Sequence, residues 1–262
     1  MASRKEQREE ARRQREEREA EERKKQRRKR RLWQIGAGVA AIAAIVIVAI
    51  LISSSGGGSD QKVDSTEENE SAQLFEGIAQ SGDTLGNPDA KVTIYEFADL
   101  QCPFCKQYTD TVYPQLVEKY VKPGNVKMVW RNLTFLGPDS ITGARAVVAA
   151  GAQNKLWNMQ HLFYENQGTE NTGYVTDKFI DNLAKGAGVD VDKLRQDMAA
   201  PFVEQQLGDA QQEAQRFGID STPSFMIQVG NGKPQPLEYE DFTLEQFSGP
   251  IDDALAQAGE GG

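Results

Sequence analysis

Cys102 and Cys105 are the only cysteines among 262 residues, and just two residues separate them. A disulfide scaffold needs more cysteines at wider spacings, and a Cys₂His₂ or Cys₄ zinc site cannot be assembled within one chain that has a single histidine. With 39% hydrophobic residues, the chain is apolar enough to build one sizeable core or two small ones. The cysteines therefore form either a redox pair or a pair without special chemistry.

Residues 33–52 form an uninterrupted apolar run with no charge and with Gln34 as its only polar side chain. At about 1.5 Å per helical residue, the run spans roughly 30 Å of hydrocarbon, which predicts one transmembrane helix. A cleaved signal peptide is the alternative, but its apolar stretch is usually about 7–15 residues long and ends in a small-residue cleavage site. Because this run is longer, we expect an uncleaved anchor.

Basic residues crowd the N-terminal side of this run and predict its orientation. Residues 1–31 contain fifteen Lys or Arg and eight Glu, whereas Lys62 is the only basic residue near the other side. The positive-inside rule then places the basic arm, residues 1–32, in the cytoplasm and the rest of the chain outside the cell membrane. We interpret the arm as a solvated helix that sets topology, with anionic lipid headgroups or RNA as alternative partners.

The chain beyond the arm is acidic, with fifteen basic and thirty-one acidic residues, which argues against nucleic-acid binding. Residues 53–73 are Gly/Ser-rich and then acidic, with almost no apolar side chains, and this composition predicts a flexible linker. We therefore expect the arm, a membrane helix at 33–52 and this linker to precede one globular domain over residues 74–262.

The cysteine motif, Cys-Pro-Phe-Cys, lies where a strand pattern gives way to a helix pattern. Residues 91–98 alternate and are rich in β-formers, whereas residues 103–121 repeat apolar side chains at helical spacing. Cys102 then caps the helix, and Pro103 takes the first helical position, where its missing N–H costs nothing. Free backbone donors and the positive helix end stabilise a thiolate on Cys102. We expect Cys102 to be the exposed, attacking thiol and Cys105 the shielded, resolving one.

Three other interpretations of the pair compete with redox chemistry: a structural disulfide, two inert thiols, and half of a metal site shared between chains. Closing so short a loop restrains the unfolded chain by only about 2 kcal/mol, which disfavours a structural disulfide. Inert thiols would not stay reduced in the oxidising environment outside the membrane. A shared metal site stays open at this stage, but the motif, its helix position and the compartment together favour a redox pair.

Beyond the motif, the pattern predicts a helical segment between two groups of strands. Residues 126–130 are expected to form a strand, and residues 140–217 several helices. Strands at 224–229 and 237–240 flank an Asn-Gly pair, the strongest short hairpin signal.

Two prolines and one capping pattern refine the expected helices. Pro114 is predicted to kink the helix that carries Cys105. Thr243 and Gln246 have the spacing of a capping box at the start of a last helix, which Pro250 is predicted to interrupt.

The residues around the pair resemble the thioredoxin-fold disulfide oxidoreductases, and among them the DsbA-like branch. The resemblance runs through residues 94–105 (Ile-Tyr-Glu-Phe-Ala-Asp-Leu-Gln-Cys-Pro-Phe-Cys), the helical stretch, and residues 218–225 (Gly-Ile-Asp-Ser-Thr-Pro-Ser-Phe). It covers nearly all of residues 74–262 and implies a thioredoxin fold interrupted by a helical domain at about 140–217. Phe104 departs from the pattern, because the strongest oxidants of the family carry a histidine there.

The resemblance also assigns roles to residues outside the motif. Pro223 resembles the family's cis-proline, and Thr222 before it would lie against the disulfide and offer its backbone to an extended substrate. Glu96 shares a strand face with apolar residues, which suggests a buried carboxyl. In the family, an acid at this position lies beneath the disulfide, which implies a proton relay for Cys105; a solvated strand residue is the alternative.

We therefore expect an α/β protein with a thioredoxin-like fold, an inserted helical domain and one preceding transmembrane helix. Its function would be that of a single-pass, membrane-anchored, monomeric enzyme that donates disulfides to unfolded or reduced secreted proteins through a mixed disulfide on Cys102. A membrane-embedded protein would reoxidise it, and neither cofactor nor metal is expected. A disulfide isomerase or reductase is one alternative, although the isomerases of this superfamily carry a dimerisation domain. A non-catalytic binding or chaperone module is the other.

Overall fold

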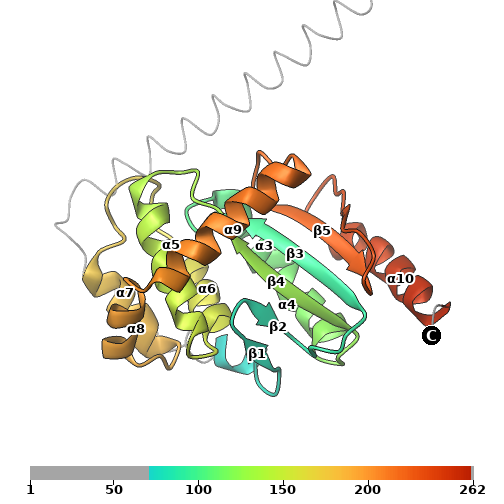
Figure 1. The fold of residues 1–262 in the computed structure, drawn as a ribbon, viewed down its shortest axis with the longest axis horizontal. Helices are drawn as coiled ribbons and strands as arrows, with labels where there is room; N and C mark the ends of the chain where they lie inside the picture. The colour runs from blue at the N-terminus through green and yellow to red at the C-terminus, as the bar shows by residue number, and fades with distance from the viewer. Residues whose placement is uncertain (1–70, 261–262) are drawn as a thin grey trace, which may run out of the picture. The chain divides into compact units, whose positions relative to one another are not determined.

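The computed structural model describes residues 71–260. Six strands form one sheet in the order β1-β2-β4-β3-β5-β6, in which β3 and β4 run parallel and every other neighbouring pair runs antiparallel (Figure 1). The strands are β1 (Gln80–Ser81), β2 (Thr84–Leu85), β3 (Val92–Ala98), β4 (Val126–Asn132), β5 (Ser224–Val229) and β6 (Gln235–Pro236). The strands predicted at 91–98, 126–130 and 224–229 are confirmed as β3, β4 and β5.

The central strand β3 is buried on both faces, and its alternation decides which side chains enter which core. Ile94 and Glu96 point into the main core, whereas Phe97 belongs to a smaller cluster with Met226 of β5 on the opposite face. Ala214, on a helix that covers this second face, completes the small cluster. Since β3 ends at Ala98, the chain leaves the sheet four residues before Cys102.

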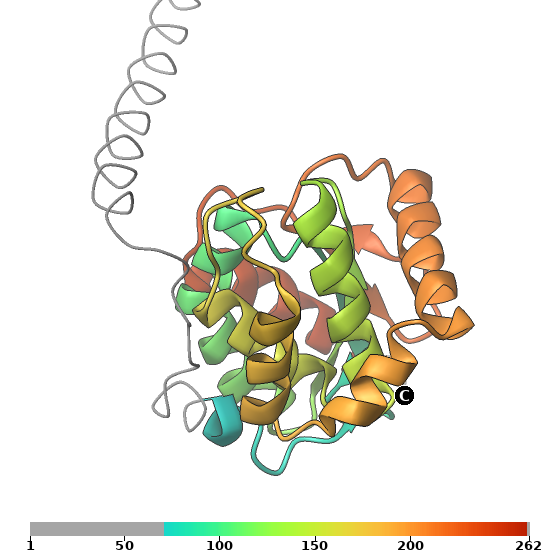
Figure 2. The same ribbon diagram turned by 90° about the vertical axis from the view of Figure 1, so that its left-hand side faces the viewer.

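Helices precede, cover and interrupt this sheet. The helix predicted at 103–121 is divided into α3 (Pro103–Thr111), α4 (Tyr113–Leu116) and the π-helical turn η1 (Val117–Val121). The insertion between β4 and β5 consists of α5 (Pro138–Gly151), α6 (Leu156–Glu165), α7 (Asp177–Gly186), α8 (Val191–Asp197) and α9 (Pro201–Phe217), and the last helix is α10 (Leu244–Glu260). Figures 1 and 2 show α5 to α8 gathered beside the sheet, whereas α9, drawn in orange, crosses one of its faces. The predicted helical domain is thereby confirmed in kind.

The break after α3 has a local cause. Pro114 is the second residue of α4, and its ring disfavours a regular helix through this point because it clashes with the carbonyl four residues earlier and supplies no N–H. The helix accordingly bends at Val112, which has φ −96° and ψ −41°. The kink predicted at Pro114 is confirmed, but the π-helical turn that follows was not predicted.

The C-terminal region differs from the prediction in three ways. The second hairpin strand is Gln235–Pro236 and not 237–240, because Leu237 turns its side chain into the core and the Tyr239 hydroxyl donates to the Pro223 carbonyl at 2.6 Å. The capping box does not form, since the Thr243 hydroxyl donates to Asp241. Helix α10 also continues through Pro250.

The segments predicted before the globular domain lie largely outside the described residues. The basic arm, the membrane helix at 33–52 and residues 53–70 of the linker lie there, so they stay predictions. Residues 71–74 form a helical turn with Ser71 buried, so the packed domain begins slightly before Leu74. Among residues 71–260, no helix is both long and apolar enough to cross a bilayer.

The contact between α5 and α6 supplies a test of the packing near the motif. A Cβ added at Gly143 of α5 would lie 2.7 Å from a ring carbon of Phe163 and 3.3 Å from Leu100. We expect Gly143→Ala to lower the free energy of unfolding by about 1–3 kcal/mol in a urea titration, because the ring has to move. Gly208→Ala on α9, where a Cβ meets open space, is the control and should stabilise by up to about 1 kcal/mol. Equal effects at both sites would contradict this packing.

Candidate redox site

The two cysteines lie at the start of α3 as the sequence predicts. Cys102 is the N-cap residue, with φ −70° and ψ 121°, and Pro103 follows at the first helical position. Both thiols are reduced. Cys105 is fully buried, whereas Cys102 is 5% exposed and so is less open than the expected exposed thiol. The predicted order of accessibility holds, and only the edge of Cys102 faces solvent.

The loop before β5 covers Cys102. The Thr222–Pro223 peptide bond is cis, as expected from the resemblance. The Cys102 thiol donates to the Thr222 carbonyl, with 3.3 Å between sulfur and oxygen, so residues 120 positions apart in the sequence meet at the site. Thr222 is thereby placed against the Cys102 sulfur, with Pro223 next to it in the chain, and this contact helps to explain why so little of Cys102 is exposed.

The environments of the two thiols push their pKa values apart. The pKa of Cys102 is lowered from 9.0 to about 6, and the main cause is a hydrogen bond from the Cys105 thiol. Burial of Cys102 opposes this effect. A hydrogen bond from the Thr222 side chain and the backbone N–H groups of Cys105 and Phe104 lower the pKa further. Burial raises the pKa of Cys105 well above its usual value, and the bond to the Cys102 sulfur adds to the rise. Only Cys102 is therefore a thiolate at neutral pH.

Alkylation of the reduced protein tests this division. We expect iodoacetamide to modify Cys102 with a rate that rises through a midpoint near pH 6, because the thiolate is the nucleophile. Cys105 should stay unmodified until the protein unfolds, since it is fully buried. Peptide mapping by mass spectrometry distinguishes the two residues, and modification of Cys105 first would reverse their roles.

Glu96 lies in the main core at the middle of the sheet. It pairs with Trp130 of β4 and Phe225 of β5, is fully buried, and has no hydrogen-bond partner for either carboxylate oxygen among the described residues. Burial raises the pKa of Glu96 from 4.5 to about 8, so the carboxyl is largely protonated at neutral pH. The buried position predicted from the strand alternation is confirmed.

Buried tyrosines connect the region of Glu96 with that of the thiols. Burial is the main cause that raises the pKa values of Tyr108, Tyr113 and Tyr164, and the charge of ionised Glu96 adds to the rise. For Tyr164, the charge of Cys105 contributes as well. Glu96 and Cys105 therefore both affect the same buried hydroxyl of Tyr164 when they carry a charge.

Asp99 is a residue of this site that the sequence analysis missed. Its side chain is fully buried. Its carboxylate accepts hydrogen bonds from the Ser140 hydroxyl at 2.6 Å and from the backbone N–H groups of Gln101 and Leu136 at 2.9 and 3.1 Å. The bond to the N–H two residues ahead is an Asx turn, and an Asp at the end of a predicted strand was the available signal for it.

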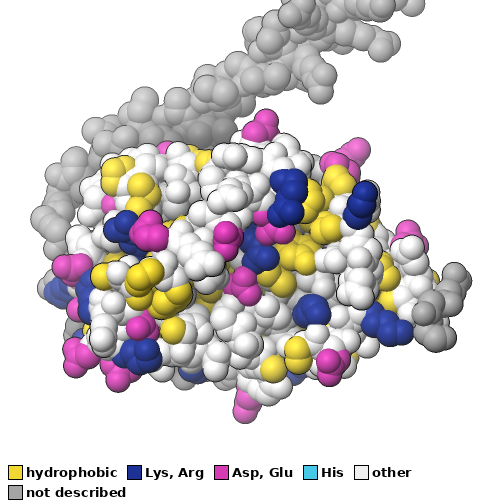
Figure 3. All heavy atoms as spheres, in the orientation of Figure 1, with side chains coloured by type: hydrophobic (Ala, Val, Ile, Leu, Met, Phe, Trp, Pro, Cys, Tyr) yellow, Lys and Arg dark blue, Asp and Glu magenta, His cyan; other side chains and the backbone are white. Residues whose placement is uncertain are grey.

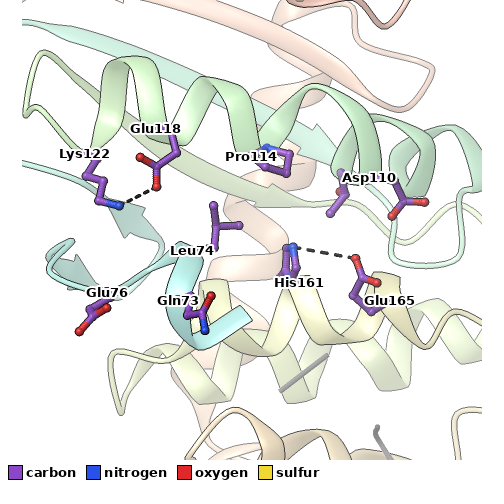
Figure 4. A pocket seen from close by; sticks show the side chains of 10 residues that line it. Gln73, Leu74, Glu76, Asp110, Pro114, Glu118, Lys122, His161 and Glu165 are labelled. Atoms are coloured by element: carbon purple, nitrogen blue, oxygen red, sulfur yellow. Dashed lines mark hydrogen bonds and ion pairs between the residues drawn. The ribbon is translucent and has the colours of Figure 1, made fainter. Parts of the chain in front are cut away.

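His161, to which the sequence analysis assigned no role, is a packing residue. Its ring lies 5.8 Å from that of Phe75 and 6.3 Å from that of Tyr113, and burial lowers its pKa to about 4. It lines a cavity of about 690 Å³ between the α3–η1 segment and α6, into which Figure 4 shows Leu74 also projecting. Neither cysteine lines this cavity, so it is separate from the redox site.

Within residues 71–260, we looked next for reactive or metal-binding groups other than the two thiols. In residues 71–260, no group of three or more His, Cys, Asp or Glu side chains is arranged to hold a metal ion. On the face seen in Figure 3, acidic and basic side chains are interspersed. The thiols are therefore the reactive groups that the described residues bring together.

Known proteins share both the sequence and the fold of this domain. The Thioredoxin family matches residues 79–252. The probable disulfide bond formation protein D of Bacillus cereus is 29% identical over 155 residues, which cover 58% of this chain and 72% of the relative. The disulfide bond formation protein D of Bacillus subtilis is 24% identical over 165 residues, which cover 62% and 74%. The crystal structure of oxidised BdbD from Bacillus subtilis aligns with a TM-score of 0.58 at 22% identity, over 68% of this chain and 97% of that one.

The family match extends over more than half of the chain and includes both the cysteine motif and the cis-proline loop. The chain belongs to the thioredoxin family, and within that family it is a DsbA-like protein-disulfide oxidoreductase. The fold and the enzyme class expected from the resemblance are thus confirmed.

Proposed function

We propose that this protein is a membrane-anchored disulfide donor for unfolded or reduced proteins outside the cytoplasm. The observation that carries the proposal is the pairing of an acidic, partly accessible Cys102 with a fully buried Cys105 under the Thr222 carbonyl. A stabilised Cys102 thiolate favours the reduced form of the enzyme and thereby favours transfer of its disulfide to a substrate.

The proposed exchange conserves electrons between two dithiols. A substrate thiolate attacks the Cys102 sulfur of the oxidised enzyme, the Cys102–Cys105 bond breaks, and Cys105 leaves as a thiolate that takes up a proton. A second substrate thiolate then attacks the substrate sulfur of the mixed disulfide and releases the Cys102 thiolate. The substrate is oxidised by two electrons and the enzyme is reduced by two. The low pKa of Cys102 makes it a good leaving group in the second step.

We assign to Glu96 the proton transfer that Cys105 requires. With a pKa of about 8, its carboxyl holds a proton at neutral pH and is able to give it to the departing Cys105 thiolate. During reoxidation the same group, once deprotonated, takes a proton from Cys105. The high pKa of Cys105 makes such help necessary, because the unassisted thiol does not ionise near neutral pH.

Substrate would bind across the cis-proline loop. Thr222 would offer its backbone to an extended peptide, as in other cases where a peptide adds alongside a strand. A hollow of about 340 Å³ beside this loop is lined by apolar residues such as Ile219 and Pro223 together with polar residues such as Ser221, Ser224 and Glu238. Phe104, two residues after Cys102, adds an apolar side chain that is 59% exposed. This mixed lining fits an extended peptide that presents both polar and apolar groups.

The arm at 1–32, the helix at 33–52 and the linker at 53–73 would hold this domain outside the cell membrane. The curated relatives from Bacillus are named for disulfide bond formation, which supports a role in oxidation. A membrane-embedded partner would accept the two electrons and restore the disulfide. We propose that the enzyme acts as a monomer, because the segment at 53–73 has the composition of a tether and not of a dimerisation domain.

Trapping a mixed disulfide tests this function. In a Cys105→Ala variant, Cys102 still attacks a disulfide of a substrate or of the reoxidising partner, but no thiol remains to release it. We expect covalent complexes that disappear on reduction, and none in a variant that lacks Cys102 as well. Complexes that form equally in both variants, or in neither, would favour a binding module whose cysteines are incidental.

Labelling of intact cells tests the topology. A membrane-impermeant amine reagent should modify lysines of the outer domain, such as the exposed Lys178, and spare those of the basic arm. Permeabilised cells supply the control, in which both regions react. Labelling of the arm in intact cells, or a mature protein that starts after Ile52, would overturn the anchored topology.

A further inference from the structure

The segment that leads into the cysteine motif is hydrogen-bonded to the helical insertion. Residues 99–102 connect β3 to α3, and their side chains and carbonyls bond to the helical insertion at several points. The Tyr164 hydroxyl of α6 donates to the Asp99 carbonyl at 3.1 Å, and the Gln101 side chain donates to the Ser140 hydroxyl of α5 at 2.9 Å. The insertion therefore contacts the approach to Cys102 directly.

A strap of residues 166–173, between α6 and α7, makes the contacts that extend to Cys102 itself. The Gln167 side-chain amide lies 2.7 Å from the Leu100 carbonyl oxygen and 3.2 Å from the Cys102 carbonyl oxygen, and it donates to both. Further along the strap, the Asn171 backbone N–H donates to the Gln101 side-chain oxygen at 2.8 Å. One strap thus bonds to three consecutive residues that end at the attacking cysteine.

The backbone conformation of the strap and its contacts with the start of α5 hold it in place beside the motif. Asn171 has a positive φ of 56°, a conformation that asparagine tolerates better than most residues. Gly137, just before α5, has a φ of 97°, and a Cβ there would lie 2.4 Å from the Asn171 side-chain oxygen. The Asp139 carboxylate accepts from the Gly173 backbone N–H at 2.9 Å. The strap is therefore anchored at its far end as well as at the motif.

The Cys102 carbonyl has a second role that makes its orientation matter. It accepts the backbone N–H of Lys106 at 3.1 Å, which is the first hydrogen bond of α3. The direction of this carbonyl therefore sets how the helix N-terminus faces the Cys102 sulfur, and the backbone N–H groups there stabilise its thiolate. The Gln167 amide, which donates to this carbonyl oxygen, orients the negative end of the carbonyl dipole toward the strap.

We propose that Gln167 is a positioning residue of the redox site, through which the helical insertion holds Cys102 at the N-terminus of α3 in the geometry that stabilises its thiolate. The proposal deepens the proposed function and rests on it only in regarding Cys102 as the attacking thiol. Gln167 touches neither the sulfur nor the substrate and acts through the carbonyl groups of Leu100 and Cys102.

The test is the pH profile of Cys102 alkylation in the full-length, reduced protein. Gln167→Leu retains most of the side-chain volume and removes both donated bonds. Loss of one net hydrogen bond whose whole effect fell on the thiolate form would raise the pKa of Cys102 by about 0.7 unit, so we expect a rise of up to this size and up to about a five-fold lower alkylation rate below pH 6. Gln167→Glu replaces the donor with a negative charge and should raise the pKa at least as far.

Gln153 provides a matched control within the same insertion. Its side chain also makes two hydrogen bonds to a backbone, donating to the Asp190 carbonyl at 3.1 Å and accepting the Asp190 N–H at 2.9 Å, and neither residue contacts residues 99–102. Gln153→Leu should leave the profile of Cys102 unchanged, even if both leucine variants lose similar stability. Circular dichroism confirms that each variant is folded at the pH values used.

The outcomes separate this inference from the proposed function. An unchanged profile in folded Gln167→Leu and Gln167→Glu overturns the inference, as does an equal shift in Gln153→Leu. A shift confined to the Gln167 variants supports it. If the unsubstituted protein fails to transfer its disulfide to a reduced substrate while the shift is observed, the positioning role stands and the donor function fails.

Discussion

Replacement of Cys102 with serine is expected to abolish disulfide transfer to a reduced protein substrate, with a loss of more than about a thousand-fold in rate. The hydroxyl cannot form the mixed disulfide, and Cys105 cannot substitute because it is fully buried with a strongly raised pKa. The measurement is the refolding yield of a reduced, disulfide-containing test protein under anaerobic conditions with stoichiometric enzyme.

A Cys105→Ser variant is the matched comparison. It should also fail to complete oxidation, but when it is mixed with a substrate that already contains a disulfide, its Cys102 thiolate should attack that disulfide and accumulate mixed disulfides, which Cys102→Ser cannot do. Residual transfer by Cys102→Ser at more than a few per cent of the unsubstituted rate would show that Cys105, the remaining thiol, is able to act as the attacking group.

Replacement of Glu96 with glutamine is expected to change how stability depends on pH. A carboxyl whose pKa is raised from 4.5 to about 8 on folding contributes stability below pH 4.5, and that contribution is lost as the pH rises through 8. Relative to Glu96→Gln, the unsubstituted protein should therefore lose on the order of 5 kcal/mol in free energy of unfolding across this range. The amide cannot ionise, so its stability should be flatter.

Urea titrations of the reduced proteins from pH 4.5 to 9 measure this difference. Glu118→Gln, at an exposed site of η1, is the control and should change stability by less than about 1 kcal/mol at any pH. If Glu96 also relays the proton of Cys105, Glu96→Gln should slow resolution of a preformed mixed disulfide. Parallel stability profiles would contradict a buried, protonated carboxyl, whereas an unchanged resolution rate would leave Glu96 a structural residue.

The sequence predicts the parts of this fold that depend on local pattern. The alternation at residues 91–98 gave β3 and placed Glu96 on a buried face, because one strand face must meet the core. The position of Cys102 as the N-cap follows from Pro103, which fits only the first turn of a helix. The cis bond before Pro223 could be inferred from the resemblance alone, since local sequence favours trans for most prolines.

Features that depend on contacts between distant segments escaped prediction. Carboxylates are seldom buried, but the Asp99 carboxylate is satisfied by the distant Ser140 hydroxyl and Leu136 N–H in addition to the local Gln101 N–H. Gln167 had no signal, since its partners are backbone carbonyls that any residue type supplies. The last strand was misplaced because Leu237 is drawn into the core and ends the pairing early.

The reduction potential of the Cys102–Cys105 pair tests the central claim most directly. At pH 7, a pKa of about 6 for Cys102 stabilises the reduced form by about 1.4 kcal/mol relative to an ordinary thiol, which corresponds to about 30 mV. Equilibration with glutathione buffers should therefore give a potential between about −270 mV, the value for thioredoxin, and about −120 mV, the value for DsbA. A potential in this interval agrees with a disulfide donor, whereas a value below about −270 mV would contradict it and indicate a reductase.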